Sequence, residues 1–142
     1  MRGLMLIGAL VLLPALQEPT PPEAPQPIAT MKQLMVDVIY PASNSLLVSV
    51  NRGGPADDRE WAEARRSAMT LAESSNLLIL RNRAATWVAD ARLLADVGAA
   101  AYKAAEAKDA KALASLSTHI DASCTTCHKH SRPAVFPHAT QN

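Results

Sequence analysis

Residues 86–109, TWVADARLLADVGAAAYKAAEAKD, decide the fold class of this chain. Apolar or small residues recur in this stretch at alternating intervals of four and three, which places them on one face of an α-helix. This face consists of Trp87, Ala91, Leu94, Gly98, Ala101 and Ala105. The many alanines suit close packing between helices, and Thr86 is the residue that we expect to cap the helix. The stretch therefore predicts an all-α protein.

Two earlier segments have the same helical periodicity. The first covers residues 28–49, and we expect Pro41 to bend it, because the proline ring displaces the carbonyl group four residues back. The second opens at Asp57, whose spacing to Glu60 resembles a capping box, and continues to about Arg83. Its apolar end, NLLIL, has no polar face.

The last segment begins at Asp109 and carries its apolar stripe to the two cysteines of the chain. Its inward positions are Leu113, Leu116 or Ser117, Ile120, Cys124 and Cys127. Short connections, such as NRGGP at 51–55, join four segments of similar length. This organisation predicts an antiparallel four-helix bundle over residues 28–133, with a two-stage coiled-coil hairpin or a swapped dimer as the alternative.

The N-terminal part of the chain predicts export. Residues 1–16 contain one arginine and then an apolar run, which fits a signal peptide with Ala15 as the best cleavage candidate. The run is short for a bilayer span, and an uncleaved membrane anchor is the alternative. Residues 17–27 are rich in proline and predict an extended linker, whereas residues 134–142 form a C-terminal tail.

The composition argues against nucleic acid as a partner. Lysine and arginine number 14 against 13 aspartate and glutamate residues, and aromatic residues make up 4% of the chain. The sequence has no basic stripe with interleaved aromatic residues. A net charge of +1 also provides little long-range electrostatic steering.

The segment CTTCHKH, from Cys124 to His130, is compatible with three chemistries. Thiol redox motifs usually lie at a helix N-terminus, where the helix dipole lowers the thiol pKa, but this pair comes late in its helix. Zinc needs four ligands, and Cys124, Cys127 and His128 cannot easily face one ion from a continuous helix, although His130 or His138 could complete a distorted set. C-x-x-C-H supplies two thiols for covalent attachment of haem and an imidazole for its iron. The sequence favours one covalently attached haem per chain.

At this motif the chain resembles the class II c-type cytochromes, which comprise cytochrome c′ and its low-spin, methionine-ligated relatives. This family carries C-x-x-C-H near the C-terminus of a four-helix bundle, followed by an aromatic residue and an arginine. Here Ser131 stands at the aromatic position, and Arg132 matches the arginine. The resemblance implies that Cys124 and Cys127 form thioethers to haem c and that His128 is the proximal axial ligand of the iron.

The resemblance also implies where the haem lies. In an antiparallel bundle the end of the last helix lies beside the start of the first, the end of the second and the start of the third. We therefore expect Leu34 and Trp87 to line the haem pocket and Arg132 to lie near a propionate or the imidazole. The other residues expected around the haem are Met31, Met35, Val38, Asn76 to Leu80 and Ala91.

The sixth iron ligand decides between two functions. Met31 and Met35 lie one turn apart on the inward face of the first segment, and a thioether pairs with histidine in electron-transfer haems. Low-spin members of the family carry their ligating methionine early in the first helix, within a segment similar to KQLM at 32–35. We therefore expect Met35 as the distal ligand and Met31 as the second choice.

With Met35 bound to iron, the protein is expected to be a periplasmic carrier of single electrons. Without a methionine ligand the iron would be five-coordinate, as in cytochrome c′, and the protein would bind nitric oxide or carbon monoxide. No acid–base constellation accompanies the motif, and His119 is expected to face solvent, so we do not expect an enzyme. The sequence does not identify the redox partner, and the family often dimerises through its first two helices, so a homodimer is an expected state beside the monomer.

Overall fold

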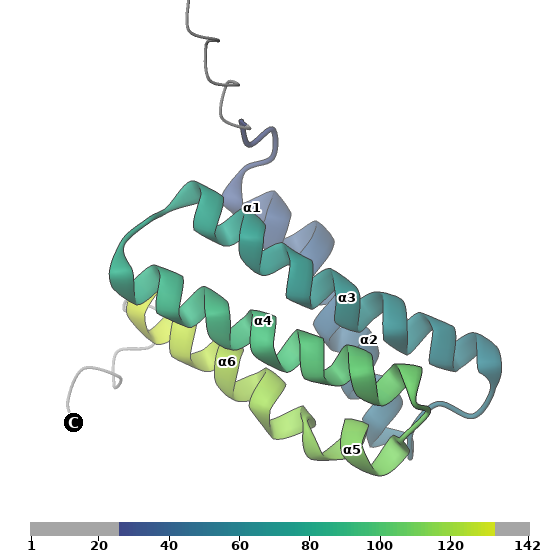
Figure 1. The fold of residues 1–142 in the computed structure, drawn as a ribbon. Coiled ribbons are helices and arrows are strands. Elements are labelled where there is room, and N and C mark those ends of the chain that lie inside the picture. The colour runs from purple at the N-terminus through teal and green to yellow at the C-terminus, as the bar shows by residue number, and fades with distance from the viewer. Residues whose placement is uncertain (1–25, 133–142) are drawn as a thin grey trace, which may run out of the picture.

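The computed structural model describes residues 26–132, which form an all-α fold. The helical elements are α1 (Met31–Gln33), η1 (Leu34–Ile39), α2 (Tyr40–Asn51), α3 (Asp58–Arg81), α4 (Ala85–Glu106), α5 (Ala110–Ser115) and α6 (Ser117–Ser131). They make four rods, because α1, η1 and α2 are continuous and α5 continues into α6. Consecutive rods run in opposite directions (Figure 1). The expected all-α class is confirmed, whereas the signal peptide, most of the linker and the C-terminal tail lie outside the described residues.

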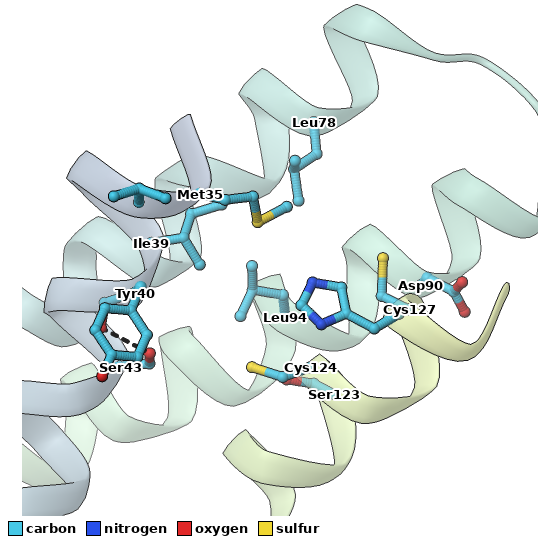
Figure 2. A pocket seen from close by; sticks show the side chains of 12 residues that line it. Met35, Ile39, Tyr40, Ser43, Leu78, Asp90, Leu94, Ser123, Cys124 and Cys127 are labelled. Carbon is cyan, nitrogen blue, oxygen red and sulfur yellow. Dashed lines mark hydrogen bonds between the residues drawn. The ribbon is translucent and has the colours of Figure 1, made fainter. Parts of the chain in front are cut away.

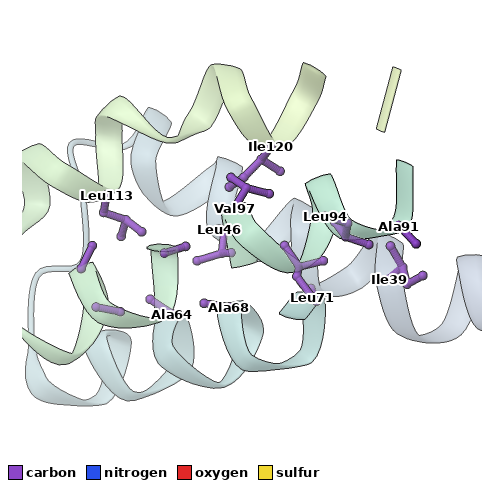
Figure 3. Packing of buried hydrophobic residues seen from close by; sticks show 14 of the residues in the cluster. Ile39, Leu46, Ala64, Ala68, Leu71, Ala91, Leu94, Val97, Leu113 and Ile120 are labelled. Carbon is purple, nitrogen blue, oxygen red and sulfur yellow. The ribbon is translucent and has the colours of Figure 1, made fainter. Parts of the chain in front are cut away.

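The four rods pack around one core in a bundle-like arrangement. Close backbone approaches link α2 to α3, α3 to α4, α4 to α6 and α6 to α2, so that each rod has two neighbours. Figure 3 shows the apolar side chains between them, and the most deeply buried large ones are Leu46, Leu71, Leu113 and Ile120. Small residues dominate the rest of the core, and this lets the backbones of α3 and α4 come close together.

Gly98 lies at a close approach of α3 and α4. A Cβ atom at this position would lie 2.5 Å from the backbone nitrogen of Ala72 and 2.9 Å from its Cα atom. The sequence placed Gly98 on the inward stripe of its helix, and the structure supplies the reason for glycine there. Only a residue without a side chain fits at this crossing.

The first rod differs from the sequence-based expectation in two ways. It begins at Met31 instead of Ile28, which is fully exposed, and Thr30 caps it through a capping box with Gln33. The rod passes through Pro41, but the six residues before the α2 segment are π-helical, and the Tyr40 N–H donates to the carbonyl five residues back. This wider turn relieves the crowding that the proline ring causes against the preceding turn.

The helix α3 begins at the N-cap expected from the sequence, whereas α4 does not. Asp57 caps α3 by accepting a hydrogen bond from the Glu60 N–H at 2.8 Å, whereas the Glu60 carboxylate accepts from Ala56 instead of completing a capping box with Asp57. The expectation that Thr86 caps α4 is wrong, because the N-cap is Ala84 and Thr86 lies in the first turn.

The fourth rod begins with the expected cap and then breaks. Asp109 accepts a hydrogen bond from the Ala112 N–H at 2.9 Å. The rod is interrupted at Leu116, where α5 ends and α6 begins. The hydroxyl groups of Ser115 and Ser117 each donate to a carbonyl three residues back, and such bonds compete with the helical backbone ladder.

Candidate functional site

The CTTCH cluster, which we define as Cys124, Cys127 and His128, lies in the last turns of α6. Spacings of three and four residues place these side chains on one face of the helix. Cys127 is buried, and Cys124 and His128 are half-buried. All three line a cavity of ≈ 290 Å³ whose walls are predominantly apolar.

The opposite wall of this cavity comes from three other rods. Met35 and Ile39 belong to the π-helical segment η1, Leu78 to α3 and Leu94 to α4. Figure 2 shows the Met35 side chain extending into the cavity from the first rod, across from Cys124 and Cys127. π-helical turns occur frequently at functional sites. Such a turn changes the directions in which its side chains point.

A second cavity, of ≈ 470 Å³, adjoins the first. It shares Met35, Val36 and His128 with the first cavity, so these residues lie between the two spaces. Its other lining residues are Met31, Lys32, Trp87, Ser131 and Arg132. Individually these volumes lie near or within the range typical of small-molecule sites.

The structure brings some of the expected site residues together, whereas Leu34, Val38, Ala91 and all of Asn76 to Leu80 except Leu78 line neither cavity. Trp87 and Arg132 line the second cavity, and the Trp87 indole N–H donates to the Leu78 carbonyl at 2.8 Å, which holds the ring against the end of α3. Leu34 was expected in the pocket, but it is 2% exposed, belongs to the hydrophobic core and lines neither cavity. Met31 lines only the second of these two cavities, whereas Met35 lines both.

Burial controls the protonation of the cluster. It raises the pKa of the Cys124 and Cys127 thiols, and the Asp90 carboxylate adds to this effect at Cys127. Burial, followed by the nearby Arg132 guanidinium, lowers the pKa of His128. Near neutral pH the cysteines are therefore thiols, unlike the thiolates of redox motifs, and the imidazole is in the neutral form that binds metals.

Asp90 is a residue of this site that the sequence reasoning missed. It is 5% exposed, lines the first cavity and accepts a hydrogen bond at 2.8 Å between its Oδ2 atom and Nδ1 of His130. This hydrogen bond links α4 to the end of α6 between two residues that are 40 positions apart in the sequence. Its spacing from Trp87 and Leu94, three and four residues, was a signal that Asp90 faces inward.

The geometry also bears on the zinc alternative. His130 was a candidate fourth ligand, but its ring contacts Asp90. Within residues 26–132, no three His, Cys, Asp or Glu side chains gather closely enough to hold a metal ion. His138 lies outside the described residues.

The donor set of the cavity fits a covalently held haem. Two thiols and one imidazole stand on one helix face, a thioether faces them, and the remaining wall is largely apolar, as a porphyrin requires. No family model, curated protein or solved structure matches the chain. None of the helices formed by residues 26–132 is long and apolar enough to cross a membrane. The fold and site together define an all-helical protein with a cysteine–histidine cluster beside an apolar cavity.

Proposed function

We propose that the chain is a monohaem c-type cytochrome of the class II type, built as an antiparallel four-helix bundle, which carries single electrons in the periplasm. The observation that carries this proposal is that the CTTCH cluster and Met35 line the same apolar cavity from opposite sides. The cluster has the residue types and order of a haem-attachment motif. Met35, on another helix, would supply a thioether sulfur as a second ligand.

Each residue of the cluster has a distinct role in this proposal. Haem supplies one-electron redox chemistry at its iron when it is bound. Cys124 and Cys127, as neutral thiols on one helix face, would form the two thioether bonds that fix the ring to α6. His128, kept neutral by burial, would be the proximal ligand.

Two observations favour Met35 over Met31 as the distal ligand. Met35 lines the cavity that Cys124, Cys127 and His128 also line, whereas Met31 lines only the second cavity, which neither cysteine borders. Met35 also lies in the π-helical segment η1, which brings Ile39 to the same wall. As an iron ligand in addition to His128, the soft thioether of Met35 would raise the reduction potential.

The surrounding residues would exclude water and hold the ring edge. Ile39, Leu78 and Leu94 supply an apolar wall, which disfavours solvent near the iron. Arg132, beside the second cavity, is suited to pair with a propionate, because a guanidinium forms charge-assisted hydrogen bonds to a carboxylate. Trp87, which lines the same cavity as Arg132, would shield the ring on that side.

Periplasmic location follows from the leader in this proposal. Residues 1–16 would direct export and residues 17–27 would separate the leader from the bundle. Membrane attachment arises only if the leader remains uncleaved.

The decisive experiment produces the full chain together with the haem-attachment machinery. Intact mass should increase by one haem, and Cys124→Ala and Cys127→Ala should each lose one thioether. Oxidised and reduced absorption spectra should report a low-spin, six-coordinate iron that binds carbon monoxide poorly. An unmodified mass with two free thiols, or a zinc adduct, would exclude the proposal.

Met35→Ala and its matched control Met31→Ala test the distal ligand. Met35→Ala should give a five-coordinate spectrum, a lower reduction potential and rapid binding of carbon monoxide. Met31→Ala should leave the spectrum low-spin. A wild-type spectrum that is already high-spin would favour the five-coordinate, gas-binding function instead. If only Met31→Ala lost the low-spin spectrum, Met31 would be the distal ligand in place of Met35.

A further inference from the structure

The charges of the chain are distributed unevenly between its two ends. Of the 14 lysine and arginine and 13 aspartate and glutamate residues, all except Arg2, Glu18 and Glu23 lie in the part that the structure describes. The helix ends that meet beside the CTTCH cluster come from residues 28–37, 76–91 and 125–132 (Figure 1). They contain five cations, Lys32, Arg81, Arg83, Lys129 and Arg132, and two carboxylates, Asp37 and Asp90.

These cations are available to an approaching molecule. Lys32, Arg83, Lys129 and Arg132 are exposed, and Arg81 is half-buried with its guanidinium on the carbonyl groups of Leu77 and Ala29. None of the five forms an ion pair with another residue of 26–132. Of the two carboxylates, Asp90 is buried and bonded to His130. The surface therefore has a strong positive excess, although the whole chain is nearly neutral.

Two of the five cations border the proposed redox site. Lys32 and Arg132 line the second cavity together with His128. The remaining residues of the described chain hold eight cations against nine carboxylates, so the opposite parts of the molecule have no comparable excess.

We propose that this basic surface, formed by Lys32, Arg81, Arg83, Lys129 and Arg132, docks an acidic redox protein over the opening of the haem site. The inference rests on the proposed electron-carrier function, and it adds the charge of the partner and the face that meets it. An electron is exchanged only with a molecule that comes close to the haem edge, so charges around that edge select the partner. Clustered charge of one sign raises the rate of productive encounter by 10- to 1,000-fold and acts even when net charge is small.

Two small oxidants of opposite charge test the local field. The reduced haem protein is mixed in a stopped-flow instrument with hexacyanoferrate(III), an anion, or with tris(phenanthroline)cobalt(III), a cation, each of which accepts one electron. The hexacyanoferrate rate should fall on the order of 10-fold as ionic strength rises from about 0.01 M to about 1 M, where the Debye length shrinks from about 30 Å to about 3 Å. The rate with the cobalt complex should rise over the same range.

Matched charge reversals separate local from global charge. Arg83→Glu/Lys129→Glu changes two exposed residues that line neither cavity, and Arg52→Glu/Lys111→Glu makes the same change in net charge on exposed residues at the opposite end of the bundle. The first variant should lose most of the salt dependence with hexacyanoferrate, whereas the second should keep it. Equal effects of the two variants, or a wild-type rate that does not depend on salt, would overturn the proposal.

Failure of the underlying function has a different signature. A protein without a haem spectrum would refute the electron-carrier proposal, whereas an intact low-spin spectrum with salt-independent rates would refute only the docking surface.

Sedimentation with vesicles that contain anionic phosphatidylglycerol gives a further check. Wild-type protein that sediments, and Arg83→Glu/Lys129→Glu protein that does not, would assign the surface to a membrane and overturn its assignment to a protein partner.

Discussion

Replacing Gly98 with alanine should destabilise the protein, although alanine is the better helix former. The added Cβ atom would lie 2.5 Å from the Ala72 nitrogen, 2.9 Å from the Ala72 Cα atom and 3.1 Å from the Ala68 carbonyl oxygen. All three are backbone atoms, so no side chain can rotate away, and α4 must move from α3 until ordinary contact at 3.4–4 Å is restored. That separation weakens dispersion contacts along both helices.

The expected magnitude follows from two opposing effects. Overpacking of a core costs up to about 3 kcal/mol, and the intrinsic preference for alanine over glycine in a helix returns about 1 kcal/mol. Gly98→Ala should therefore lower the free energy of unfolding by roughly 2 kcal/mol and Tm by roughly 10 °C. Urea and thermal denaturation followed by circular dichroism measure both quantities.

Ala99→Gly provides the control, because Ala99 is exposed in the same helix. It should cost about 1 kcal/mol through helix propensity alone. If Gly98→Ala were as stable as wild type or more stable, the close backbone crossing would not limit the size of this residue, and the reasoning would be refuted.

Three further predictions concern the ends and contacts of α4. Lys108 has φ 53° at the end of this helix, so Lys108→Gly should remove strain and stabilise the fold by about 1 kcal/mol at acidic pH. The Lys108 ammonium lowers the pKa of Asp58 below 3.8, so their ion pair contributes to stability above that pH and its contribution is lost as the pH falls through the lowered pKa. Because Lys108→Gly removes this ion pair, its stabilising effect should be smaller at pH 7 than at acidic pH. Equal gains in stability at both pH values in urea titrations would contradict this. Trp87→Phe should cost about 1 kcal/mol in urea denaturation, because the indole hydrogen bond to the end of α3 is lost, and an unchanged midpoint would show that this bond is not needed. His130→Ala should lower the free energy of unfolding by about 1–3 kcal/mol, because it leaves the buried Asp90 carboxylate without this partner. The double variant with Asp90→Ala should lose less stability than the sum of the two single variants. Strict additivity in this double-mutant cycle would refute the pairing.

Local patterns predicted much of the architecture. Helical periodicity indicated the four rods, and carboxylate caps identified the starts at Asp57 and Asp109, because an N-cap bonds to the backbone within its own turn. The apolar stripe of the last segment correctly placed the two cysteines towards the interior, where Cys127 is buried and Cys124 half-buried. Each of these features depends on residues only a few positions apart.

Predictions of local detail were wrong where two local effects competed. The continuous fourth helix became α5 and α6 because serine hydroxyl groups on both sides of Leu116 bond to nearby carbonyl groups. Near Pro41 the bend stays a prediction, and the structure adds a π-helical segment ahead of the proline that the sequence did not indicate. Sequence spacing alone does not show which of two acceptable hydrogen-bonding patterns the surrounding packing selects.

The sequence by itself determined the all-α class, the inward face of each rod and the presence of the CTTCH motif. Only the tertiary structure decided which residues meet that motif. It brought Met35 to both cavities, left Leu34 in the core, and paired Asp90 with His130 across 40 residues. It also brought together, at one end of the bundle, the rod ends in whose sequence five cations occur. Periodicity sets which side of a helix is buried, but the crossing and axial position of packed helices depend on side-chain volumes in all the rods at once.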